Sequence, residues 1–134
     1  MQMTVSKEQG NIAVLQLAGH LDGQSYQDLI MKAQETIIDG AKNILLDMSE
    51  LAYISSAGLV SLHTISMLLR GEKTPDPEQG WSALKSMDRT RDGGLQKNLK
   101  LLNPPSQVIS VLDMVGFTEF FEIFTDKKKA LESF

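Results

Sequence analysis

Two adjacent hydroxyl side chains, Ser55 and Ser56, occupy the position in this sequence that is best suited to chemistry. They follow the polar stretch 48–54 and precede apolar residues at helical spacing, so we expect them at a strand-to-helix turn. These apolar residues are Leu59, Leu62, Ile65 and Leu69. At the start of a helix the first backbone N–H groups have no intrahelical partner, and they lie at the positive end of the helix dipole. The turn could therefore accept a phosphoryl group on a serine without unfolding the helix.

A phosphoryl group at this turn would act as a binding switch. It adds about −1.5 to −2 charges, whereas the helix dipole returns only about 0.3 to 1 kcal/mol at an exposed site. A partner packed over the unmodified turn would have to desolvate the dianion, and this cost can outweigh so small a gain. Phosphorylation is therefore expected to release the partner. The residues alone leave open the alternative that the serines only cap the helix, which is the common use of serine at this position.

The elements before the turn alternate between strands and a helix. Segments Met3–Lys7 and Asn11–Ala18 predict two strands joined by a turn at Gln9-Gly10. A helix follows, because apolar residues then recur at helical spacing. Its apolar stripe is Tyr26, Leu29, Ile30, Ala33 and Ile37. The apolar run Asn43–Asp47 predicts a buried parallel strand, and residues 48–54 are interpreted as the loop that leads to the serines.

After the second helix, the sequence changes character over residues 72–94, where prolines, acidic residues and a pair of glycines predict an inserted loop. The segment Asn98–Leu102 then predicts another strand, and Pro104-Pro105 begins a third helix. A short strand within Phe117–Phe124 and a terminal helix capped by Asp126 are expected to follow.

This order of elements predicts an α/β fold, with a mixed β-sheet of about four to five strands flanked by about four helices. A chain of 134 residues has the length of one domain with one core. We therefore expect a single domain over residues 1–134, with the inserted loop at about 72–94.

Composition and charge narrow the classes of function. The formal charge of −4 argues against a nucleic-acid partner, which would require clustered Lys and Arg side chains. Because there is no cysteine and only two histidines, the sequence matches no metal-ligand spacing, and we expect neither a metal nor another cofactor. No segment has the apolar length of a membrane span or the pattern of a signal peptide, so we expect a cytoplasmic protein without membrane insertion. The sequence carries no signal for oligomeric state.

A serine hydrolase is a competing interpretation of Ser56, with His20 and Asp22 as its partners. A nucleophile elbow requires Gly-x-Ser-x-Gly, and Ile54 stands where the first glycine is needed. His63 lies two turns along the predicted helix and is not a dependable base for Ser56. The residues therefore favour a protein that catalyses no reaction itself.

Three motifs of this chain resemble those of the STAS domain family, the fold of bacterial anti-sigma-factor antagonists. The segment Ser55-Ser56-Ala57-Gly58-Leu59 is similar to the family's Asp-Ser-Ser/Thr-Gly-Leu. The segment Gly19-His20-Leu21-Asp22 resembles the family's Gly-x-Leu-Asp entry to the first helix, and Asn103-Pro104 stands before the third helix as it does in the family. The first serine of the family motif is the phosphoacceptor, and it falls on Ser56. The family's preceding aspartate is replaced here by Ser55.

The resemblance implies a function and a set of partners. It implies a non-catalytic anti-sigma-factor antagonist that binds an anti-sigma factor serine kinase, is released by phosphorylation at Ser56, with Ser55 as the less favoured site, and is restored by a serine phosphatase. The implied binding face combines the loop before the first helix, the serine turn and the outer side of the second helix. Its residues are Leu21, Asp22, Gly23, Gln24, Ser55, Ser56, Ala57, Gly58 and Leu59. The alternative is a STAS subunit that binds constitutively, as a scaffold in a transporter-associated or stress-signalling complex.

Overall fold

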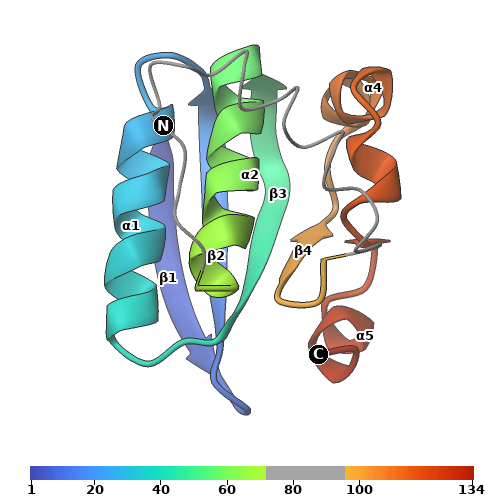
Figure 1. The fold of residues 1–134 in the computed structure, drawn as a ribbon. Helices are drawn as coiled ribbons and strands as arrows, with labels where there is room; N and C mark the ends of the chain where they lie inside the picture. The colour runs from blue at the N-terminus through green and yellow to red at the C-terminus, as the bar shows by residue number, and fades with distance from the viewer. Residues whose placement is uncertain (72–95) are drawn as a thin grey trace.

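A computed structural model describes residues 1–71 and 96–134 (Figure 1). The inserted loop predicted at 72–94 lies outside these described residues.

The strands of the described chain form one five-stranded sheet in the order β1-β2-β3-β4-β5. Their bounds are β1 Gln2–Glu8, β2 Ile12–Leu21, β3 Asn43–Ile54, β4 Leu99–Leu102 and β5 Ile123–Phe124. Strand β1 is antiparallel to β2, and every other neighbouring pair is parallel. The prediction of a mixed α/β sheet is therefore confirmed.

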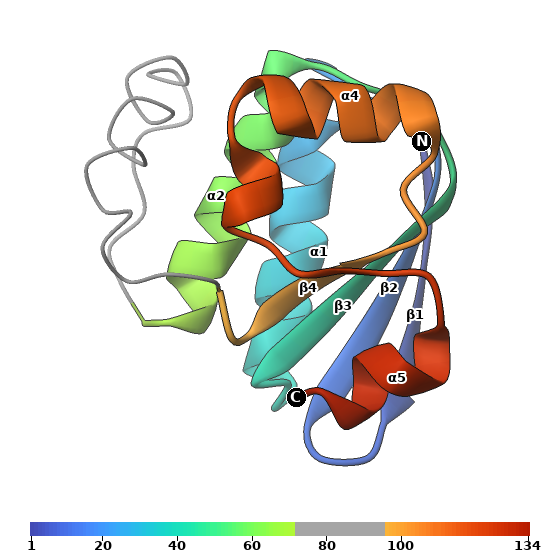
Figure 2. The same cartoon turned by 90° about the vertical axis from the view of Figure 1, so that its right-hand side faces the viewer.

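The helices lie on both faces of this sheet, as Figures 1 and 2 show. Their bounds are α1 Tyr26–Ile38, α2 Ser56–Leu69, α4 Ser106–Met114 and α5 Lys127–Glu132, with a 3-10 helix at Phe117–Glu119. Helices α1, α2 and α4 contribute side chains to the main core on one face, whereas α5 covers the other face near β4 and β5. No helix of residues 1–71 and 96–134 is both long and apolar enough to cross a bilayer.

Strand β2 is buried on both faces, as its continuous apolar run predicts. Leu15 and Leu17 point into the main core, while Val14 packs into the smaller core beneath α5. Strand β3 repeats this alternation, with Leu46 in the main core and Leu45 in the smaller one. Both central strands therefore contribute side chains to a core on each face of the sheet.

The prediction of a loop at residues 48–54 is wrong, because these residues extend β3 up to Ile54. Pairing with β2 continues to the end of the strand, and it includes two register shifts. These irregularities place buried side chains three residues apart, at Met48, Leu51 and Ile54, instead of the usual two. Because this spacing is not the two-residue spacing of a regular strand, the sequence pattern did not indicate a strand here. As a result, β3 leads directly into the serine turn.

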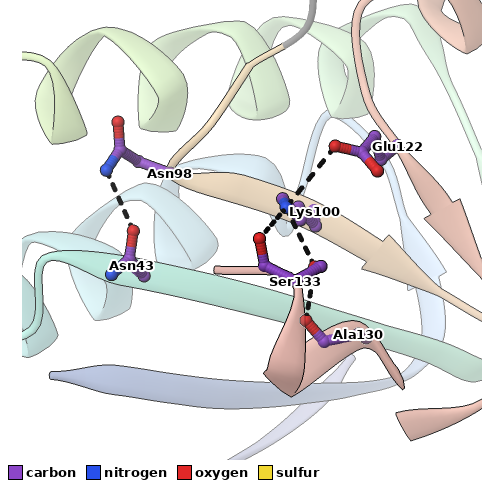
Figure 3. Close-up of polar contacts among 6 residues, drawn as sticks. All are labelled: Asn43, Asn98, Lys100, Glu122, Ala130 and Ser133. Carbon is purple, nitrogen blue, oxygen red and sulfur yellow. Dashed lines mark hydrogen bonds and ion pairs between the residues drawn. The ribbon is translucent and has the colours of Figure 1, made fainter. Parts of the chain in front are cut away.

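Helix α5 is held against the sheet by a buried lysine, Lys100 of β4, which is 3% exposed. Its Nζ donates to the carbonyl oxygen of Ser133 at 3.0 Å and to the Ser133 hydroxyl at 2.9 Å. The Glu122 carboxylate lies 3.4 Å from the same nitrogen, and the Phe134 ring centroid lies 4.8 Å away. Figure 3 shows these polar groups converging on Lys100 from the C-terminal segment. The positive charge is therefore satisfied inside the fold.

Replacing this lysine should loosen the C-terminal helix. We expect Lys100→Met to lower the free energy of unfolding by about 1–3 kcal/mol, because the carbonyl of Ser133 loses a charged donor. Urea denaturation measures the loss, and hydrogen exchange should show faster exchange in α5. The control is Lys97→Met at a neighbouring exposed position. Equal losses in the two variants would show that the contacts of Lys100 do not stabilise the fold.

Candidate functional site

The candidate site lies where the carboxyl ends of β2 and β3 meet the first turns of α1 and α2, at the upper edge in Figure 1. The last paired residues of the two strands are Leu21 and Ile54. Their pairing brings the loop after β2 next to the serine turn after β3. Two segments that are distant in the sequence therefore form one surface.

Ser55 caps helix α2. Its backbone is extended, and its hydroxyl accepts a long hydrogen bond of 3.4 Å from the N–H of Gly58. Its own N–H donates to the carbonyl of Leu21 at 2.9 Å, and its carbonyl accepts from the N–H of Leu59 at 3.0 Å. Ser55 is therefore held by both strands and by the helix, and its hydroxyl is engaged as a cap.

Ser56 is the first residue of α2, and its side chain is exposed. Within the described residues, its hydroxyl has no hydrogen-bond partner. The N–H groups of Ser56 and Ala57 belong to the first helical turn, where no intrahelical acceptor exists. A phosphoryl group on this hydroxyl would lie beside these donors and the positive end of the dipole.

Gly58 allows the helix to approach the end of β2. A Cβ atom at this position would lie 2.7 Å from Cγ1 of Ile54 and 2.8 Å from the carbonyl oxygen of Leu21. Real side chains do not tolerate such distances, so a larger residue would force the helix away from the strands. The glycine of the motif is therefore a packing requirement, and it fixes where Ser56 is presented.

The loop after β2 is folded by Ser25, which is buried and which the sequence analysis did not identify. Its hydroxyl donates to the carbonyl of His20 at 2.8 Å and accepts from the N–H of Asp22 at 3.0 Å. The carboxylate of Asp22 accepts from the N–H of Gln24 at 2.9 Å. The spacing Asp-x-x-Ser before a helix was the available signal. This network orders the loop.

The predicted binding residues divide into exposed and buried groups. Gly23, Gln24 and Ser56 are exposed, and the half-buried residues are Asp22, Ser55 and Ala57. Leu21, Gly58 and Leu59 are buried, so they can support the surface only from beneath.

Helix α2, whose outer side was expected to contribute to the binding face, is exposed at Ser56 and half-buried at Ala57 and at its last three residues. Every residue from Gly58 to Ser66 is buried, including the polar residues Ser61, His63 and Thr64. The hydroxyls of Ser61 and Thr64 donate to carbonyl groups of the same helix, Thr64 to that of Val60 at 2.8 Å. Beside the candidate site, the exposed part of α2 is therefore its first turn.

Tyr53 is an exposed aromatic residue that lies within the predicted loop 48–54 and was not among the predicted site residues. It is 50% exposed and stands three residues before Ser56. Its partner across the sheet is His20, and the two rings meet edge-on with centroids 6.0 Å apart. Exposed tyrosines are favourable anchors in protein interfaces. The alternation of exposed and buried side chains along a strand could have indicated Tyr53, but the register shifts interrupt this alternation.

The charge of this edge is acidic. Neither of the segments that form it, 19–28 and 48–59, contains a lysine or arginine, whereas they include Asp22, Asp28 and Glu50. A phosphoryl group on Ser56 would therefore meet backbone donors but no cationic side chain from these segments.

The structure does not support the interpretation of Ser56 as a hydrolase nucleophile. The ring of His20 packs against Tyr53, and no hydrogen bond joins it to Ser56 within the described residues. His63 is buried in the middle of α2. In residues 1–71 and 96–134, no group of three His, Asp or Glu side chains could hold a metal ion.

The close approach at Gly58 leads to a stability prediction. Gly58→Ala should lower the free energy of unfolding by about 1–3 kcal/mol, because the added methyl overlaps a backbone carbonyl. Urea denaturation measures the change. Gly23→Ala is the matched control, since no atom lies within 4 Å of a Cβ placed there. The interpretation of Gly58 would be contradicted if both variants had the stability of the parent protein.

The two serines should differ in their contribution to stability. Ser55→Ala removes the cap of α2 and should cost about 0.5–1 kcal/mol, near the lower end of the usual range because the hydrogen bond is long. Ser56→Ala removes a solvent-exposed hydroxyl, so its melting temperature should equal that of the parent. Thermal unfolding by circular dichroism compares the variants. A larger loss at Ser56 than at Ser55 would reverse the assignment of the cap.

The fold resembles solved structures of anti-sigma factor antagonists. The unphosphorylated form of the anti-sigma factor antagonist SpoIIAA matches with a TM-score of 0.64 at 18% identity, over 98% of this chain and 94% of that one. An anti-sigma factor antagonist from Mycobacterium paratuberculosis matches with a TM-score of 0.67 at 14% identity, over 98% and 92%. The phosphorylated form of the Bacillus cell fate determinant SpoIIAA matches with a TM-score of 0.55 at 17% identity, over 98% and 97%. The chain therefore has a SpoIIAA-like fold.

No curated protein sequence matches this chain. The family model of the STAS domain matches residues 4–73, just over half of the chain. These residues include most of β1 together with β2, β3, α1 and α2, so the match contains the whole candidate site. The chain belongs to the STAS domain family.

Proposed function

We propose that this chain is an anti-sigma-factor antagonist that binds an anti-sigma factor serine kinase while Ser56 is unmodified and is released when Ser56 is phosphorylated. The observation that carries this proposal is the exposed hydroxyl of Ser56 at the first position of α2, beside backbone N–H groups that have no intrahelical acceptor. The STAS domain provides the binding surface, and the kinase supplies the chemistry.

The choice of Ser56 over Ser55 rests on their different environments. The hydroxyl of Ser55 caps the helix and is half-buried, so modifying it would break the contact with Gly58. Ser56 makes no such contact in the described chain and is exposed. A kinase can align the γ-phosphate of ATP with the Ser56 hydroxyl and provide the base that accepts its proton. The protein itself needs no catalytic group near this serine.

A rigid turn makes the modification effective as a switch. The backbone bonds of Ser55 and the packing of Gly58 leave little room for the turn to move away from a bound partner. The dipole offsets only about 0.3–1 kcal/mol of the dianion's energy, and the two edge segments provide no cation. Shifting binding almost fully between the two states requires about 5.5 kcal/mol, which desolvation of a buried, unpaired dianion can supply.

The structural comparisons support this proposal at the level of the fold. SpoIIAA is described as an anti-sigma factor antagonist, and its structure is known in an unphosphorylated form and in a phosphorylated form. We extend this behaviour to the present chain. Capture of the kinase would free a sigma factor, and a serine phosphatase would restore the unmodified surface. These partners place the protein in the bacterial cytoplasm.

Mass spectrometry tests the site of modification. The purified chain, incubated with an anti-sigma factor serine kinase from the same genome and ATP, should gain one phosphoryl group, and digestion should place it on Ser56. Ser56→Ala should remain unmodified, whereas Ser55→Ala should still be phosphorylated. Modification confined to Ser55 would move the site by one residue. No modification would contradict the switch and favour a constitutive scaffold subunit.

Binding measurements test the effect of the charge. Ser56→Asp should weaken binding to the kinase by about tenfold or more, while its melting temperature stays close to that of the parent. Thr125→Asp is the matched control, because it adds the same charge at an exposed position before α5. Isothermal titration calorimetry provides the dissociation constants. Equal affinities for the two aspartate variants would show that charge at Ser56 does not control binding.

A further inference from the structure

Ser25 stands at the N-cap of α1, but its side chain does not cap the helix. The hydroxyl makes no hydrogen bond with the first turn of α1, and the backbone of Ser25 lies in the helical region. A serine at an N-cap usually accepts an N–H of its helix, as Ser55 does at the start of α2. The side chain of Ser25 is 7% exposed and bonds instead to residues at the end of β2. Its hydroxyl therefore holds the loop before α1 and not the helix itself.

The two hydrogen bonds of this hydroxyl hold both sides of Leu21. The carbonyl of His20 accepts from the hydroxyl at 2.8 Å, and the N–H of Asp22 donates to it at 3.0 Å. Between these two residues, the carbonyl of Leu21 accepts the N–H of Ser55 at 2.9 Å. Three consecutive residues are thus tied to Ser25 on one side and to Ser55 on the other. Ser25 therefore sets the position of the loop relative to the serine turn.

The exposed part of the loop is closed by further hydrogen bonds. The carboxylate of Asp22 accepts from the N–H of Gln24 at 2.9 Å, and the carbonyl of Asp22 accepts from the N–H of Tyr26 at 2.9 Å. Gly23 and Gln24 are exposed between these contacts. These bonds close the turn without the hydroxyl of Ser25. Loss of that hydroxyl would therefore loosen the attachment of the turn to β2 and leave the turn itself folded.

We propose that Ser25 is a positioning residue for recognition by the kinase, which would contact Gly23 and Gln24 together with the Ser56 turn. The inference rests on the proposed function of Ser56. Because the side chain of Ser25 is buried, it acts through the loop and does not contact the kinase itself. A loop that is ordered before binding lowers the entropic cost of association. Without this hydroxyl, the kinase would have to order the loop, and binding would weaken.

The loss should affect binding and not the chemical step. Ser56 is positioned by the cap at Ser55 and by the packing of Gly58, and neither contact involves the hydroxyl of Ser25. Once the kinase has bound, the Ser56 hydroxyl would meet the γ-phosphate of ATP in the same arrangement. A change of this kind raises KM and leaves kcat unchanged.

Steady-state phosphorylation kinetics of the full chain test the role of Ser25. With an anti-sigma factor serine kinase from the same genome and ATP, Ser25→Ala should raise the KM for the chain about threefold to tenfold and change kcat by less than about twofold. Ser25→Thr keeps the hydroxyl and should have the KM of the parent. The matched control is Thr36→Val, because it removes another buried hydroxyl of this region, one that donates to the carbonyl of Lys32 within α1. Its KM should equal that of the parent.

Hydrogen exchange tests the loop without the kinase. In Ser25→Ala the N–H of Asp22 loses its acceptor, so it should exchange several-fold faster than in the parent. In Thr36→Val it should exchange at the parent rate. Circular dichroism checks that each variant is folded. Unchanged exchange at Asp22 in Ser25→Ala would overturn the inference, because the hydroxyl would then not order the loop.

The kinetic outcomes separate this inference from the proposed function. A parent chain that is phosphorylated on Ser56, with a KM that Ser25→Ala leaves unchanged, would overturn the role of Ser25 alone. An equal rise of KM in Thr36→Val, a loss confined to kcat, or failure of folded Ser25→Thr to restore the parent KM would do the same. A parent chain that the kinase does not phosphorylate would overturn the proposed function and the role of Ser25 together.

Discussion

The close contact between the start of α2 and the end of β2 is the constraint on which the candidate site depends. The carbonyl of Leu21 accepts the N–H of Ser55 at 2.9 Å and would lie 2.8 Å from a Cβ at Gly58. This one oxygen therefore fixes both the cap and the first turn of the helix. The hydrogen bond requires extended backbone at Ser55, and the close approach requires glycine at Gly58. Ser56 lies between these two fixed points, so its exposure follows from the packing around it.

The loop after β2, which faces the serine turn, is also held by hydrogen bonds. The loop after β2 could have been mobile, but the buried hydroxyl of Ser25 connects the carbonyl of His20 with the N–H of Asp22. The serine turn and the loop are therefore both shaped before any partner arrives, which lowers the ordering cost of association. The burial of α2 from Gly58 to Ser66 restricts the exposed surface to the end of the helix.

The sequence predicted the parts of this site that depend on local chemistry. The cap of α2 by a serine at 55–56 and the apolar spacing of α2 are local features, and both lie where expected. The prediction was wrong where tertiary structure overrides a local pattern. Residues 48–54 were expected to form a loop but belong to β3, whose register shifts against β2 interrupt the regular strand pattern around Tyr53. The burial of polar residues on α2 depends on the tertiary fold, whereas the sequence pattern of the helix shows only its apolar spacing.

Serine in place of the family's aspartate before the acceptor changes the electrostatics of the proposed switch. An aspartate at Ser55 would place a carboxylate next to a phosphoryl group on Ser56, and two anions one residue apart repel each other. The neutral hydroxyl of Ser55 satisfies the N–H of Gly58 without adding charge. Asp22 and Glu50 make the surrounding edge acidic without a lysine or arginine in its two segments. If Ser56 is phosphorylated as proposed, the new charge would therefore lie beside a neutral cap instead of a second anion.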